Sequence, residues 1–99
     1  SKSAEVTHEE EAQVNIVFRV QIHTSQKPIT EHDTIFKGLE IHRYYHEGLY
    51  KYTTGAFKTL DAAHKEQERL REKGFEQAWV TAFNNDKRIG VRDAVELLQ

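Results

Sequence analysis

The segments FRVQIHTS (residues 18–25) and LYKYTTGAF (residues 49–57) both alternate between two kinds of side chain. Successive side chains of a β-strand point to opposite faces, so each segment predicts a strand with two different faces. One face carries residues suited to a core, namely Phe18, Val20, Ile22, Tyr50, Tyr52 and Thr54. The other carries mostly polar and charged groups with a little apolar surface, namely Arg19, Gln21, His23, Leu49, Lys51 and Thr53. We expect this second face to lie open to water.

A hairpin is predicted between residues 40–46 and 49–54, because Glu47-Gly48 suits a two-residue turn. The turn fixes which residues face each other. On one side the pairs are His46 with Leu49, Tyr44 with Lys51 and His42 with Thr53, and on the other Tyr45 with Tyr50, Arg43 with Tyr52 and Ile41 with Thr54. Residues 55–57, Gly-Ala-Phe, are expected to bend out of the sheet.

The remaining elements follow from capping and breaking residues. Residues 15–25 predict the first strand, and Thr30 is the expected N-cap of a short helix that ends at Gly38. Thr59 caps a longer helix that runs to about Lys73 and ends at Gly74. Residues 78–83 predict a fourth strand with Trp79 on the open face. Residues 87–89 suit an extension of the sheet, and residues 93–98 suit a short helix.

This order of elements predicts an α+β, split β-α-β, ferredoxin-like (RNP-like) sandwich. It would hold a four-stranded antiparallel sheet, two helices on one face and a short extra C-terminal helix. Within the 99 residues we expect an acidic flexible lead-in (1–14), the folded domain (15–83) and a C-terminal turn and helix (84–99). The run Glu9-Glu10-Glu11 marks the lead-in.

Composition narrows the function. The chain is 37% hydrophobic and 30% charged, as globular domains are, and no apolar run approaches the roughly 20 residues that span a bilayer. It has no cysteine, which excludes disulfides and thiolate chemistry. A net charge of −2 argues against nucleic acid as a partner. We therefore expect neither nucleic-acid nor membrane binding.

Two motifs carry a family resemblance. Phe18-Arg19-Val20-Gln21-Ile22, followed by Thr24 and Ser25, has the pattern aromatic-x-Val-Gln-apolar and then small residues. The second motif is YKYTTGAF at residues 50–57, with Ala62-Ala63 in the helix that follows. It is similar to the pattern Tyr-Arg-Val-x-x-Gly-Pro-Phe followed by an alanine-rich helix. Over roughly residues 16–83 the chain resembles a SPOR domain, the sporulation-related peptidoglycan-binding module of bacterial cell-wall proteins. The chain departs from the family pattern at three positions: His23 stands where the family often has glycine, Lys51 where it has arginine, and Ala56 where it often has proline.

The chain is also similar to the C-terminal region of Bacteroidetes N-acetylmuramoyl-L-alanine amidases. The similarity lies in Tyr44-Tyr45 of the second strand, in residues 49–53 (LYKYT) and in residues 83–89, which have the pattern Phe-x-Asn-x-Lys-Arg-Ile. The resemblance implies a monomeric, non-catalytic module of the bacterial periplasm or cell envelope. Such a module binds denuded glycan strands of peptidoglycan and targets a cell-wall hydrolase to them. The implied ligand residues are Gln21, Thr24, Lys51, Thr53 and Trp79, to which side-chain chemistry adds Arg19, Tyr44 and Leu49.

Other functions stay open from the residues alone. An RNA-recognition-type module or a protein-interaction or dimerisation domain would use the same sheet face. No catalytic constellation is present, and no cofactor or metal is expected. His42 and His46 have a zinc-binding spacing only on a helix; in a strand they stand about 13 Å apart.

Overall fold

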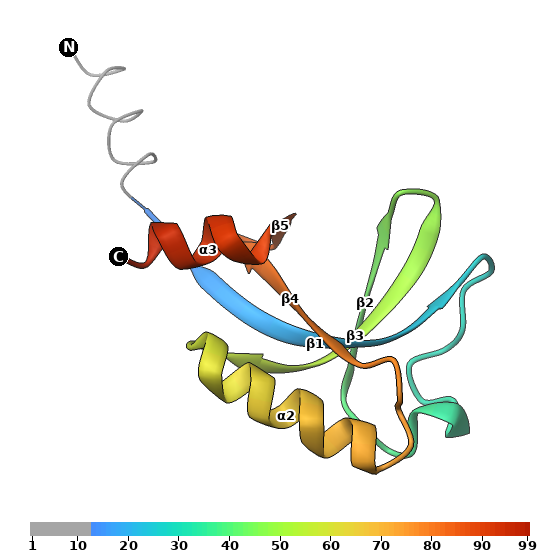
Figure 1. The fold of residues 1–99 in the computed structure, drawn as a ribbon. Helices are drawn as coiled ribbons and strands as arrows, with labels where there is room; N and C mark the ends of the chain where they lie inside the picture. The colour runs from blue at the N-terminus through green and yellow to red at the C-terminus, as the bar shows by residue number, and fades with distance from the viewer. Residues whose placement is uncertain (1–12) are drawn as a thin grey trace.

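The computed structural model describes residues 13–99 as one α+β unit (Figure 1). The strands are β1 (Ile16–Ser25), β2 (Ile41–His46), β3 (Leu49–Phe57), β4 (Trp79–Asn84) and β5 (Lys87–Ile89). The helices are the 3-10 turn η1 (Thr34–Phe36), α2 (Leu60–Glu72) and α3 (Val91–Leu97). No helix among these residues has the length and apolar character needed to cross a membrane. The acidic run Glu9–Glu11 lies outside the described residues.

The sheet is antiparallel and five-stranded, in the order β2-β3-β1-β4-β5, and it curls into a half-barrel (Figure 1). The expected four-stranded ferredoxin-like sandwich is therefore wrong. One cause is that residues 87–89 pair with β4 as a fifth strand. The other is that the connection from β1 to β2 holds only η1 where that fold needs a full helix.

The short connection has a local reason. Asp33, and not Thr30, caps η1 by accepting a hydrogen bond from the backbone N–H of Ile35. Lys37 then takes a left-handed conformation with φ 54°, and Gly38 follows with φ 80°. Two successive residues in that region end any right-handed helix. The turn is anchored by Phe36, which is buried in the core.

The hairpin register predicted from Glu47-Gly48 is confirmed at every pair from Ile41–Thr54 to His46–Leu49. The turn residues have φ of 54° and 82°, as a two-residue turn with both residues left-handed requires. The expected bend at residues 55–57 is wrong. β3 continues to Phe57, and the irregularity is a bulge against β1 at Gly55, whose φ is 80°.

The main helix α2 is confirmed, together with both of its ends. The Thr59 hydroxyl accepts a hydrogen bond from the N–H of Ala62, and Gly74 takes φ 112° just beyond the helix. The N–H of Phe75 donates to the carbonyl of Leu70 and that of Gly74 to Arg71, which is the Schellman arrangement. These bonds fix where the chain leaves α2 for β4.

The core lies between the sheet and the helices. Its centre holds the predicted inward residues of β1 and β4, together with Tyr52, and packs on Ala63 and Leu70 of α2. Ala94 of α3 belongs to the same cluster as Ala63, so the C-terminal segment 84–99 is part of this packing. Within residues 13–99, α2 thus covers one face of the sheet, and the β2–β3 hairpin projects away from it (Figure 1).

Candidate functional site

The other face of the sheet is concave, and the rings of Tyr44 and Phe83 close its centre, with the exposed His42 beside them. The ring of Tyr44 on β2 meets that of Phe83 on β4 at 5.1 Å between centroids and 88° between planes. His42 also meets Phe83, at 6.4 Å. Phe83 is consequently buried, with 3% of its surface exposed, although it points away from the helices. We call this surface the concave face; besides these three residues it holds Arg19, Gln21, Thr24, Lys51, Thr53, Trp79, Thr81 and Arg88.

Curling buries polar groups that we expected to face water. Gln21, Lys51 and Thr53 have exposed fractions of only 5%, 8% and 0%, so their expected exposure is wrong. No helix covers them: the rings of the concave face and the neighbouring strands do. A period-two pattern predicts which residues share a face, and the curvature of the sheet decides whether that face is exposed to solvent.

The buried polar groups are satisfied within the protein. The Tyr44 hydroxyl donates to Oε1 of Gln21 at 3.0 Å, and the Thr53 hydroxyl donates to the carbonyl of His42 at 3.1 Å. Nζ of Lys51 lies 3.5 Å from a carboxylate oxygen of Glu47. These contacts hold β2 against β3 and β1. Ligand contacts must therefore come first from other members of the concave face.

The accessible part of the concave face centres on Trp79 and Arg88. Trp79 is 41% exposed, as predicted from the small residues that flank it. The guanidinium carbon of Arg88 on β5 lies 5.4 Å from the centre of the Trp79 ring. Nε of Arg88 is buried and has no hydrogen-bond partner among the described residues. A buried donor without an acceptor is costly, so a ligand acceptor near it would be stabilised.

Arg19 supplies a second guanidinium to the concave face. One of its nitrogens donates to the carbonyl of Gly55 at 3.0 Å, and its guanidinium carbon lies 5.9 Å from the Phe83 ring. Among residues 13–99 neither Arg19 nor Arg88 forms an ion pair with a carboxylate. A hollow of about 290 Å³ adjoins Arg19, lined by Arg19, Glu40, Ile41, His42, Gly55 and Ala56. The concave face thus carries positive charge that its own acids do not neutralise.

The same surroundings shift the pKa of two groups. Burial, and then the charge of Arg19, lowers the pKa of His42 below its usual 6.5. Burial raises the pKa of the Tyr44 phenol, and the charge of Arg88 opposes that rise. Both shifts favour the uncharged forms of His42 and Tyr44, so the positive charge of the concave face comes from the two arginines.

A bulge in β1 moves two side chains from the faces that strict alternation predicts. The register against β3 shifts between Gln21 and His23. His23 then lies against Phe36 and Tyr52, on the helix side, at 6.1 and 5.8 Å between ring centroids. Thr24 pairs with Lys51 and is exposed on the concave face. Thr24 and Gln21 therefore lie on the same face only because of this bulge, which the sequence pattern does not predict.

The remaining predicted residues, Tyr44 and Leu49, are half-buried. Leu49 pairs with His46 beside the turn. Sequence reasoning placed His42 opposite Thr53 and Phe83 on the face of Trp79 but did not name either as a site residue, and it missed Arg88. Asn85 and Asp86 both take positive φ and form a two-residue hairpin turn between β4 and β5. Recognising Asn-Asp as such a turn would have placed Arg88 opposite Phe83.

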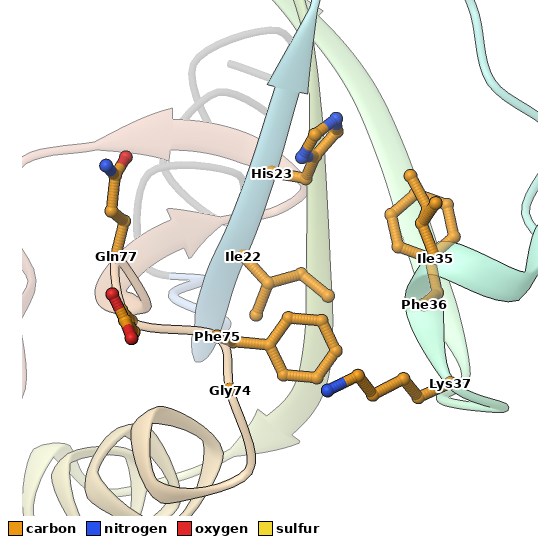
Figure 2. Close-up of a pocket in the computed structure, with 9 residues that line it drawn as sticks. Ile22, His23, Ile35, Phe36, Lys37, Gly74, Phe75 and Gln77 are labelled. Atoms are coloured by element: carbon orange, nitrogen blue, oxygen red, sulfur yellow. The ribbon is translucent and has the colours of Figure 1, made fainter.

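A second hollow lies on the helix side of the sheet, between η1 and the segment that follows α2 (Figure 2). It has about 400 Å³ and an apolar floor that includes Ile22, Phe36 and Phe75. Lys37 reaches across its mouth: Nζ lies 5.1 Å from the centre of the Phe75 ring and donates to the carbonyl of Lys73 at 2.8 Å. Lys37 is therefore engaged in joining η1 to the C-terminal end of α2.

The two histidines with a zinc-binding spacing are arranged differently from a helical site. His42 and His46 lie on the strand β2, where the helical spacing does not apply. Within the described part of the chain, no three His, Asp or Glu side chains gather closely enough to hold an ion.

Comparison with known proteins gives no relative: no family model, no curated protein and no solved structure matches the chain.

Proposed function

We propose that this chain is a non-catalytic module that binds a denuded glycan strand of peptidoglycan on its concave face. It would direct a cell-wall hydrolase, such as an N-acetylmuramoyl-L-alanine amidase, to its substrate in the bacterial periplasm or envelope. The observation that carries the proposal is the Trp79–Arg88 pair, an exposed indole under a guanidinium whose Nε lacks a partner.

The chemistry of such a strand fits these groups. A glycan from which stem peptides have been removed presents lactyl carboxylates between apolar sugar faces. The indole of Trp79 offers flat apolar surface at little cost in side-chain entropy. Arg88 and Arg19 can each receive a carboxylate in a charge-assisted hydrogen bond, and no acid of the described residues occupies them.

The buried members of the predicted site take a different part. Gln21, Lys51 and Thr53 hold the curvature through Tyr44, Glu47 and His42. Thr24 is the exposed polar residue that pairs with Lys51, next to a small hollow of about 60 Å³ that Trp79 also lines. We therefore expect Trp79, Arg88, Arg19 and Thr24 to make contacts with the sugar. Affinity should be modest, because a shallow face must offset the ordering of the strand.

Retention on purified sacculi, before and after amidase treatment that strips the peptides, tests the proposal. We expect retention to rise after stripping and to fall about tenfold for Trp79→Ala or Arg88→Gln, the loss of one hydrogen bond or stacking contact. Ile35→Ala and Arg92→Gln are the matched controls, because both residues are exposed away from the concave face. Equal retention by all four variants would contradict the proposal. Retention on single-stranded RNA without sacculus binding would favour an RNA-recognition module.

A further inference from the structure

Strand β2 is an edge of the sheet with free hydrogen-bonding groups. Residues next to a two-residue turn form a hydrogen-bonded pair, and such pairs then alternate along the hairpin. His46, Tyr44 and His42 therefore point their backbone groups at β3, consistent with the bond from the Thr53 hydroxyl to the His42 carbonyl. The backbone N–H and C=O groups of Ile41, Arg43 and Tyr45 point outward.

Among residues 13–99, no hydrogen bond uses the outward backbone groups of β2. The loop before β2 approaches the strand only through the side chain of Arg43, which donates to the carbonyl of Ile29 at 3.2 Å. Sheets usually protect their edges with proline, lysine or inward charge, and the six residues of β2 contain no proline, lysine or acid. The opposite edge, β5, is only three residues long and runs directly into Gly90 and α3. Tyr45, at 63%, has the largest exposed fraction of any large hydrophobic side chain described.

We propose that β2 pairs with β2 of a second copy of this chain, in an antiparallel register centred on Tyr44. Only residues with outward backbone groups can form the hydrogen-bonded pairs, which leaves registers centred on Arg43 or on Tyr44 near the middle of the strand. Centring on Arg43 places two guanidiniums opposite each other, which is unfavourable. Centring on Tyr44 places Arg43 of each copy opposite Tyr45 of the other, so the pair occurs twice.

The Arg–Tyr pairing makes the edge self-complementary. Within one chain Arg43 already lies over an aromatic ring, with 5.4 Å from its guanidinium carbon to the centre of Tyr50. Across the interface it would meet Tyr45, whose ring packs on Tyr50 at 5.0 Å. Two such cation–π contacts and the backbone bonds would join two sheets into one, with their concave faces continuous. This departs from the monomer that we expected from the sequence, and it does not depend on glycan binding.

Cross-linking tests the register, because the chain has no cysteine of its own. Opposed residues of a hydrogen-bonded antiparallel pair have Cα atoms about 5.5 Å apart, within disulfide range. Under mild oxidation, a mixture of Arg43→Cys and Tyr45→Cys should form a disulfide-linked heterodimer, while each variant alone stays unlinked. Self-linking of Arg43→Cys alone would overturn the register.

Sedimentation velocity over a concentration series tests the interface itself. The unsubstituted chain should show a concentration-dependent dimer. Tyr45→Lys should raise the dissociation constant about tenfold or more, because it sets an ammonium against Arg43 of the second copy. Ile35→Lys is the control, since Ile35 is 45% exposed away from β2. A chain that stays monomeric at every soluble concentration, or that binds only an unrelated strand at this edge, would overturn the proposal.

Discussion

The phenol of Tyr44 and the ring of Phe83 stand 5.1 Å apart and nearly perpendicular, although two strands separate β2 from β4 in the sheet. In a flat sheet those strands would lie about 14 Å apart. The contact therefore measures the curl of the half-barrel. It also explains why the polar residues between them are buried.

Phe83 should be a core residue despite its place on the concave face. We expect Phe83→Ala to lower the free energy of unfolding by about 3–5 kcal/mol, as for other buried phenylalanines, and Phe83→Leu by about 1 kcal/mol. Urea denaturation followed by circular dichroism measures both. A loss below about 1 kcal/mol for the alanine variant would show that the rings do not close this face.

The hydroxyl of Tyr44 should act through Gln21. Tyr44→Phe keeps the ring on Phe83 and removes the 3.0 Å bond to Gln21. In a double-mutant cycle with Gln21→Leu we expect a coupling energy of about 1 kcal/mol. Thr59→Ala, at the N-cap of α2, is the control partner, and its effect should add to that of Tyr44→Phe. Additivity in both cycles would mean that the bond does not stabilise the sheet.

The bulge at Gly55 should tolerate a side chain less well than the hairpin turn does. Gly48 and Gly55 have nearly equal φ, 82° and 80°, so alanine at either position costs about 1–2 kcal/mol for its conformation. A Cβ at Gly48 meets nothing within 4 Å, whereas at Gly55 it would lie 2.5 Å from the ring of Phe57. Phe57 packs on both core clusters and cannot turn away freely.

We therefore expect Gly55→Ala to destabilise the protein by about 1 kcal/mol more than Gly48→Ala. Thermal or urea unfolding of the two variants gives the difference. Equal losses would show that Phe57 moves aside without cost.

Stability should fall as the solution becomes mildly acidic, through His42. Burial and Arg19 lower the pKa of this residue in the folded state, so the unfolded chain binds the proton first. The contribution of His42 is complete above its ordinary pKa of 6.5, declines as pH falls below that value, and levels off below the folded pKa. Urea midpoints across this range, with His42→Gln as the comparison, measure it.

Two further measurements separate the causes for His42. An NMR titration of its imidazole should give a midpoint below 6.5, and Arg19→Met should move that midpoint upward by removing the second cause. A midpoint at or above 6.5 would contradict the arrangement of the two side chains.

Local patterns predicted local structure well. Glu47-Gly48 determined the hairpin and all its pairs, and Thr59 and Gly74 determined the ends of α2. These features depend on contacts between residues close in sequence, whose turn and cap preferences are strong. The small residues around Trp79 likewise placed it correctly on the face away from the helices.

Outside the bulge beside His23, the sequence by itself determined which residues share a strand face, and only the tertiary structure decided how much of that face is exposed to solvent. Curvature arises from the bulges at Gly55 and beside His23 and from rings that meet across strands, such as Tyr44 and Phe83. These contacts join residues far apart in the chain, so no period in the sequence encodes them. The same closure buried Gln21 and Thr53 and left Trp79 exposed beside the half-buried Arg88.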